Sequence, residues 1–132
     1  MLVRLCLVFL VLTGATVGFW ALAFPAGFYG AFPGCGRVWI SLDGPYNEHL
    51  VRDVGGMNLG FAALALFALL RPKLAAPLVV GWATLIFNSA HVIYHATKLG
   101  LYQPIDQVAQ MFALGSALLA SIVLASRVGE RS

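Results

Sequence analysis

The sequence predicts an all-α fold, a four-helix transmembrane bundle that forms a single domain over residues 1–132. The composition is one reason, because 61% of the residues are hydrophobic and only 10% are charged, which is outside the usual range of soluble domains. Four apolar runs are the other reason, since each approaches the roughly 20 residues needed to cross a bilayer. These runs span about 4–24, 48–70, 74–98 and 105–126.

The first run carries no charge from Leu5 to Phe24, and we expect it to remain in the protein as a membrane span. The alternative is a cleaved secretory signal, because Arg4 precedes the run and Ala21-Leu22-Ala23 fits the small-x-small cleavage pattern. Retention is favoured because the apolar run is longer than the usual signal core of about 7–15 residues.

The connection from Pro25 to Asn47 is the longest in the chain and is rich in aromatic residues, glycine and proline. Aromatic side chains favour the membrane–water interface, whereas glycine and proline interrupt regular structure. We expect a folded outer loop along that interface, with a short helix near Ala26 to Phe32. It forms either an aromatic belt or a lid over the polar residues of the third span.

The second span begins with a concentrated polar turn. Asn47 is a good N-cap residue, and Glu48 then lies in the first turn, where a carboxylate complements the helix dipole. Helical spacing pairs Glu48 with Arg52 and His49 with Asp53. We expect this turn to be drawn into the outer interface and to contribute to a pocket.

Gly56 and Gly60 follow in the same span. Small residues four apart allow two membrane helices to approach closely. The pair therefore predicts a contact face for a neighbouring helix.

The third span carries a polar face at steps of three and four residues, which places its members on one side of a helix. Ionisable groups in a membrane usually face the bundle interior and are candidates for function. The members of this face are Gly81, Thr84, Asn88, His91, His95 and Lys98.

The fourth span begins at Pro104, a residue suited to the first helical turn, and carries Gln103, Asp106 and Gln110 along one face. We expect a polar pocket to close between the second, third and fourth spans near the outer surface. Its candidate residues are Glu48, His49, Arg52, Asp53, Asn88, His91, His95, Asp106 and Gln110.

The distribution of Lys and Arg predicts the orientation in the cell membrane. Five of these residues fall on one side of the four spans and three on the other, which predicts that both termini are cytoplasmic. The short Arg71-Pro72-Lys73 turn strengthens the prediction, because the rule applies best to short loops. The two sets are Arg4, Arg71, Lys73, Arg127 and Arg131 against Arg37, Arg52 and Lys98.

The histidines allow a metal site, although the sequence requires no cofactor. His91 and His95 lie one turn apart on a helix, and His49 or a nearby carboxylate would complete a set for zinc or iron. The histidines could equally serve as hydrogen-bonding groups inside a polar seam between helices.

These residues predict a binding or accessory subunit in the lipid bilayer, with a lipid-like ligand and either a partner membrane subunit or a homo-oligomer. The alternative is a membrane enzyme that acts on a lipid-like substrate by His/carboxylate acid–base chemistry, with Arg52 holding an anion. Nucleic acid is not expected as a partner, because the chain has no run of Lys and Arg.

The chain also resembles a group of small four-span bacterial integral membrane proteins that have no established activity. The resemblance covers nearly the whole chain and implies four transmembrane helices with the polar turn at the start of the second. It rests on the aromatic residues of the first loop, on His91 with His95, and above all on Asn47-Glu48-His49-Leu50-Val51-Arg52-Asp53-Val54-Gly55.

Overall fold

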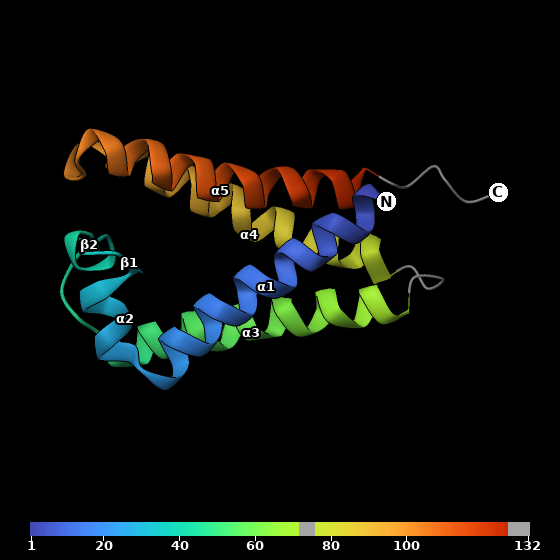
Figure 1. The fold of residues 1–132 in the computed structure, drawn as a ribbon, viewed down its shortest axis with the longest axis horizontal. Helices are drawn as coiled ribbons and strands as arrows, with labels where there is room; N and C mark the ends of the chain where they lie inside the picture. The colour runs from blue at the N-terminus through green and yellow to red at the C-terminus, as the bar shows by residue number, and fades with distance from the viewer. Residues whose placement is uncertain (72–75, 127–132) are drawn as a thin grey trace.

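The computed structural model describes residues 1–71 and 76–126, and most of these residues are helical (Figure 1). Four helices are long and apolar enough to cross a membrane, which confirms the predicted all-α fold class. Lys73, Arg127 and Arg131, which were used to predict the orientation, lie outside the described residues. In chain order the elements are α1 (Leu2–Ala23), α2 (Pro25–Ala31), β1 (Pro33–Gly34), β2 (Arg37–Val38), η1 (Ile40–Leu42), α3 (Glu48–Leu70), α4 (Ala76–Lys98), η2 (Leu99–Leu101) and α5 (Pro104–Ala125).

The long helices pack as two pairs, α1 with α3 and α4 with α5, with fewer contacts between the pairs. Glycine makes the close approaches possible. A Cβ added to Gly55 would lie 2.5 Å from the backbone nitrogen of Leu22, and one added to Gly81 would overlap the backbone of Ala125. The predicted contact face at Gly56 and Gly60 is wrong, because an added Cβ there would meet nothing within 4 Å. Successive helical residues point about 100° apart, so Gly55 faces α1 while Gly56 faces away.

All four long helices meet at the end of the bundle that holds the N-terminus, which we call the terminal end. From there α1 crosses diagonally, from beside the last turns of α5 toward the start of α3, so α1 and α5 diverge toward the opposite, loop end (Figure 1). The divergence leaves space between the helix pairs at the loop end. The buried core of the terminal end consists of Cys6, Leu7, Leu10, Ala65, Ala68, Val80, Ala120 and Leu124.

Residues 25–47 fold into a structure at the loop end that we call the cap. Its helix α2 coincides with the short helix predicted near Ala26 to Phe32 and has Pro25 at its first position. Strands β1 and β2 then form a hairpin with a two-residue loop, Cys35-Gly36, whose φ angles are 55° and 74°. Positive φ at both positions is the backbone that type I′ hairpin turns require.

Aromatic rings hold the cap on the bundle. Phe28 packs against Trp20 of α1, with ring centroids 5.8 Å apart, and against Phe32 at 4.8 Å. Phe32 in turn contacts Trp39 at 5.9 Å. Edge-to-face and tilted contacts of this kind add about 0.5–1.5 kcal/mol each to the stabilisation from burial. The aromatic residues of this loop therefore form a packed cluster at one end of the bundle.

Candidate functional site

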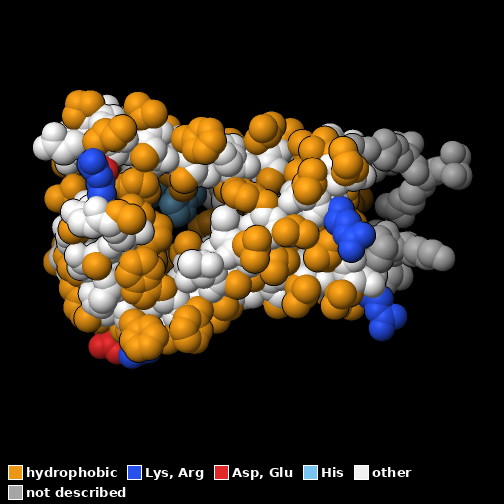
Figure 2. Space-filling view, in the orientation of Figure 1, with side chains coloured by type: hydrophobic (Ala, Val, Ile, Leu, Met, Phe, Trp, Pro, Cys, Tyr) orange, Lys and Arg blue, Asp and Glu red, His pale blue; other side chains and the backbone are white. Residues whose placement is uncertain are grey.

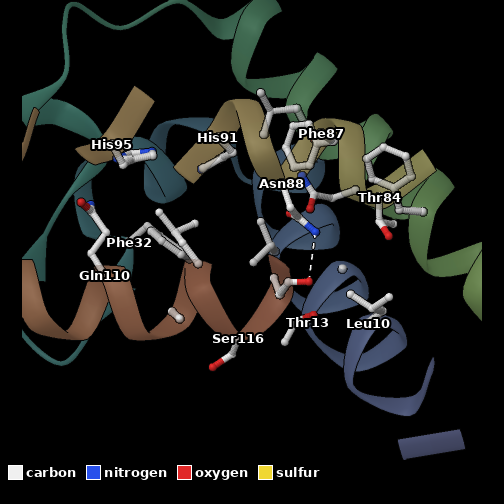
Figure 3. Close-up of a pocket in the computed structure, with 18 of the residues that line it drawn as sticks. Leu10, Thr13, Phe32, Thr84, Phe87, Asn88, His91, His95, Gln110 and Ser116 are labelled. Carbon is white, nitrogen blue, oxygen red and sulfur yellow. Dashed lines mark hydrogen bonds between the residues drawn. The ribbon is translucent and has the colours of Figure 1, made fainter. Parts of the chain in front are cut away.

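A cavity of about 550 Å³ lies between the two helix pairs, beneath the cap. Residues of α1, α3, α4, α5 and the cap line it (Figure 3). Its walls are mainly apolar, and α4 contributes the largest share of the polar side chains, with Gln110 and Ser116 on α5 and single polar residues on α1 and α3. A site of this size and character falls within the range of about 300–1,000 Å³ that is typical of small-molecule pockets.

The polar face predicted for the third span lies on α4 and forms one wall of the cavity. Asn88 donates hydrogen bonds to Ser121 Oγ at 2.9 Å and to the carbonyl oxygen of Ala117 at 3.3 Å, which joins α4 to α5. Thr84 donates to the carbonyl oxygen of Val80 at 2.7 Å. Asn88 therefore combines a place on the cavity wall with a contact between two helices, whereas the Thr84 hydroxyl bonds within α4.

His91 and His95 continue this wall toward the loop end. Their rings stack with centroids 4.7 Å apart, as expected for two residues one turn apart on one helix face. His95 is only 8% exposed, and its Nδ1 makes no hydrogen bond with any described residue. The imidazole therefore has one polar atom available to a molecule in the cavity.

Gln110 extends from α5 toward His95 on the opposite wall (Figure 3). Its side chain is buried, with 2% exposure, and its Oε1 accepts no hydrogen bond from the described residues. Buried polar atoms without partners are rare in folded proteins, because each costs about 1–3 kcal/mol. The Gln110 side chain lies close enough to act on the His95 imidazole, yet His95 Nδ1 and Gln110 Oε1, at the same end of the cavity, make no hydrogen bond of normal geometry with a described residue.

Asp43 and Tyr102 extend the polar region out of the cavity. The Tyr102 hydroxyl donates to Asp43 Oδ1 at 2.8 Å and also lies beside Gln110. Burial, together with the hydrogen bond to Asp43, raises the pKa of Tyr102 to about 12. Asp43 is close enough to act electrostatically on both His91 and His95.

Sequence reasoning did not select Asp43 or Tyr102 as site residues. Both lie in connections, one between α1 and α3 and one between α4 and α5, so no helical spacing relates them. In the sequence they are recognisable only as an acidic residue and a tyrosine that lie next to expected membrane spans. The contact depends on how the cap folds over the bundle, and helical periodicity carries no information about that.

The polar turn at the start of α3 lies outside the cavity, contrary to the expected shared pocket. Its pairs form as predicted, with Arg52 to Glu48 at 2.8 Å and His49 to Asp53 at 3.3 Å. Arg52 also donates to the carbonyl oxygen of Leu22, which ties α3 to the end of α1. All four side chains are substantially exposed, because helical geometry turns the neighbouring apolar residues inward instead. The residues of α3 that line the cavity are the apolar Leu50, Val51, Val54 and Phe61 and the polar Asn58.

The predicted metal set of His49, His91 and His95 is not assembled. The His49 side chain is 88% exposed and faces Asp53, whereas the other two histidines line the cavity. Within residues 1–71 and 76–126, no group of three His, Cys, Asp or Glu side chains is placed to hold a metal ion.

Asp106 is also placed differently from the prediction, because it binds the cap instead of lining the cavity. Its Oδ2 accepts from Arg37 Nη1 at 2.9 Å, and its Oδ1 accepts from Trp39 Nε1 at 3.0 Å. Asp106 lies in the first turn of α5, where its charge also complements the helix dipole. The residue therefore fixes the cap over the cavity.

Comparisons with protein-family models, with curated proteins and with solved structures find no match to this chain. The function is therefore argued from the geometry and chemistry of the cavity.

Proposed function

We propose that this protein binds a lipid-like amphiphile in the cavity between its helix pairs, as a binding or accessory protein of the membrane. One observation carries the proposal: an apolar cavity of about 550 Å³ has two unsatisfied buried polar atoms, His95 Nδ1 and Gln110 Oε1, at one end. An apolar pocket with a few convergent polar groups is the usual form of a ligand site.

The cavity also has a route from the bilayer. Leu50 and Phe112 line it, yet they are 60% and 77% exposed, so its walls are continuous with the apolar surface of the bundle. A histidine side chain is visible within a hollow of this surface (Figure 2). A hydrophobic molecule can therefore reach the cavity sideways from the hydrocarbon without crossing water.

A purely structural role for the polar residues of α4 explains only part of the arrangement. Asn88 and Thr84 have hydrogen-bond partners within the bundle, as a packing seam requires. His95 Nδ1 and Gln110 Oε1 have none among the described residues. A seam that served packing alone would be expected to satisfy its buried polar atoms, so the pair favours an occupant.

We also propose that the loop end faces the outside of the cell membrane. The support is the distribution of Lys and Arg in the sequence, five on the side of Arg4 and Arg71, which lie at the terminal end, against three at the loop end, Arg37, Arg52 and Lys98. Cys35, exposed in the cap, provides a test. A membrane-impermeant maleimide is expected to label intact cells that express the protein but not its Cys35→Ser variant. Labelling only after the membrane is permeabilised would reverse the orientation.

Acid–base catalysis on the bound molecule is the second candidate, favoured by the electrostatic contact of Asp43 with His91 and His95. A carboxylate beside a histidine pair is a suitable arrangement for proton transfer. The role earlier considered for Arg52 as an anion holder has no support, because its guanidinium lies outside the cavity and contacts Glu48 and Leu22. Chemical conversion of the co-purified lipid by wild-type protein, lost in His91→Gln, would favour the enzyme.

Lipid co-purification tests the proposal directly. Val54 lines the cavity, whereas Met57, on the same helix, does not, so Val54→Trp and Met57→Trp form a matched pair. Native mass spectrometry of protein released from mild detergent is expected to show bound lipid in wild type and Met57→Trp, and little in Val54→Trp. Equal occupancy in both variants, or no bound lipid in wild type, would contradict the proposal.

A histidine substitution separates binding from packing. If His95 only packs helices, His95→Gln lowers thermal stability in detergent while the retained lipid is unchanged. Our proposal expects the opposite result, a loss of bound lipid with stability largely kept, because the imidazole Nδ1 makes no hydrogen bond with the residues that the structure describes.

A further inference from the structure

The lining of the cavity contains no formal charge. Among the described residues that form its walls there is no Lys, Arg, Asp or Glu. An unpaired ion placed against such walls would pay a large desolvation cost. The cavity therefore disfavours an ionised headgroup, such as a phosphate or a carboxylate.

Most polar groups on the walls already donate a hydrogen bond within the protein. The donor groups of Thr13, Asn58 and Ser116 each bond to a carbonyl oxygen one turn earlier in their own helix, at 2.7–2.9 Å. Thr84 and Asn88 are engaged as described above. These groups contribute little to the recognition of a headgroup.

Two fully buried atoms of the lining, His95 Nδ1 and Gln110 Oε1, have no hydrogen-bond partner among the described residues, and they indicate which chemistry fits. Oε1 of Gln110 is an acceptor that receives no hydrogen bond of normal geometry from a described residue, whereas Nδ1 of a neutral histidine either donates or accepts. A hydroxyl group donates one hydrogen bond and accepts others, so it can satisfy both atoms at once. A carbonyl or an ether can satisfy only a donor and would leave Oε1 of Gln110 without a partner.

The position of these atoms also sets the direction of the ligand. His95 and Gln110 lie at one end of the cavity, and Leu10 and Thr84 lie at the other (Figure 3). The apolar lining of the cavity includes the rings of Phe9, Phe61 and Phe87. A hydrocarbon chain that extends from the polar end would therefore lie along apolar side chains.

We propose that the occupant is an uncharged long-chain lipid whose polar end carries a hydroxyl group, held between His95 and Gln110. This inference rests on the proposed lipid-binding function and names the class of ligand. Free fatty alcohols, isoprenoid alcohols and neutral glycerides share this chemistry, and competition among them would distinguish these sources.

A chain-matched series tests the headgroup in the wild-type protein. Purified protein in detergent is titrated with oleyl alcohol, oleyl methyl ether and oleate at neutral pH, and binding is followed by native mass spectrometry. Oleyl alcohol is expected to bind about tenfold more tightly than the methyl ether, the value of one hydrogen bond of roughly 1.4 kcal/mol. Oleate is expected to bind still more weakly than the ether.

A variant pair assigns the effect to Gln110. Gln110→Met keeps a side chain of similar length but removes the acceptor, and it should bring alcohol binding down to the ether's level without changing ether binding. Gln103→Met, at an exposed position before α5, should preserve the tenfold preference.

The outcomes separate the two proposals. Equal binding of alcohol and ether, or tighter binding of oleate, would overturn the hydroxyl assignment and leave the lipid-binding function standing. Failure of all three probes to bind, in a protein that also carries no co-purified lipid, would overturn both. Because the ligand series uses unmodified protein, the result does not depend on how well a variant folds.

Discussion

Trp39 donates a hydrogen bond from its indole Nε1 to Oδ1 of Asp106 at 3.0 Å, which joins the cap to the first turn of α5. Arg37 donates to the other oxygen of the same carboxylate at 2.9 Å. One side chain of α5 thus holds two residues of the cap, which covers the proposed site. A second connection, from Tyr102 to Asp43, links the cap to the segment between α4 and α5.

Asp106→Leu is expected to lower the free energy of unfolding by about 3 kcal/mol, because it leaves the buried indole N–H and the Arg37 guanidinium without their acceptor. Asp106→Asn should cost about 1 kcal/mol, since its amide oxygen can still accept from Trp39. Denaturant unfolding in detergent measures both. Asp53→Leu, at an exposed ion pair, is the control and should change stability by no more than about 0.5 kcal/mol. Equal effects at the two positions would contradict the anchoring role.

Gly55 and Gly56 provide a test of the α1–α3 packing. Gly55→Ala should destabilise the protein by about 1–3 kcal/mol, because its Cβ would lie 2.5 Å from the Leu22 backbone nitrogen and the helices would have to separate. Gly56→Ala meets open space and should be neutral or stabilising by up to about 1 kcal/mol. Thermal unfolding of the two variants in the same detergent gives the comparison. A reversed order would mean that α1 packs on the other face of α3.

Helical periodicity was sufficient to predict the four spans and the polar face of α4. Apolar length identifies a membrane helix, and the three- and four-residue spacing of Asn88, His91 and His95 places them on one side of it. The same reasoning predicted the N-cap at Asn47, whose Oδ1 accepts from the Leu50 backbone N–H at 3.1 Å. These features depend only on residues close together in the sequence.

Contacts between distant segments were harder to predict. The sequence analysis placed the polar turn of α3 in one pocket with the α4 histidines because both sets of residues are expected near the same membrane surface. The depth of a residue in the membrane does not determine which way its side chain points. The residues of the turn are Glu48, His49, Arg52 and Asp53. The rotation of α3 about its axis follows from the close approach of Gly55 to α1, which directs Val51 and Val54 to the cavity. The position of Asp43 depends on the fold of the cap, which no periodic pattern reveals.

Ser121 and Ser116 test the polar connection between α4 and α5. Ser121 is fully buried and accepts a hydrogen bond from Asn88 at 2.9 Å, whereas the Ser116 hydroxyl bonds only within its own helix, to Phe112. Ser121→Ala should therefore cost about 1 kcal/mol of unfolding free energy, and Ser116→Ala no more than about 0.5 kcal/mol. Denaturant titration compares them. An equal cost would show that the contact between the helices adds nothing to stability.

Tyr102 predicts a specific dependence of stability on alkaline pH. Burial raises its pKa from 10.0 to about 12 in the folded protein, so between these values the unfolded chain loses the phenolic proton while the folded chain keeps it. The stabilising contribution is thus complete below pH 10 and is lost as the pH rises toward 12. Thermal unfolding should show a decline in this window that is shallower in Tyr102→Phe, which is less stable at neutral pH because it lacks the hydrogen bond to Asp43. Tyr29→Phe, which loses a bond to the exposed Gly44 carbonyl, should retain the wild-type decline. Parallel declines in wild type and Tyr102→Phe would show that another group is responsible.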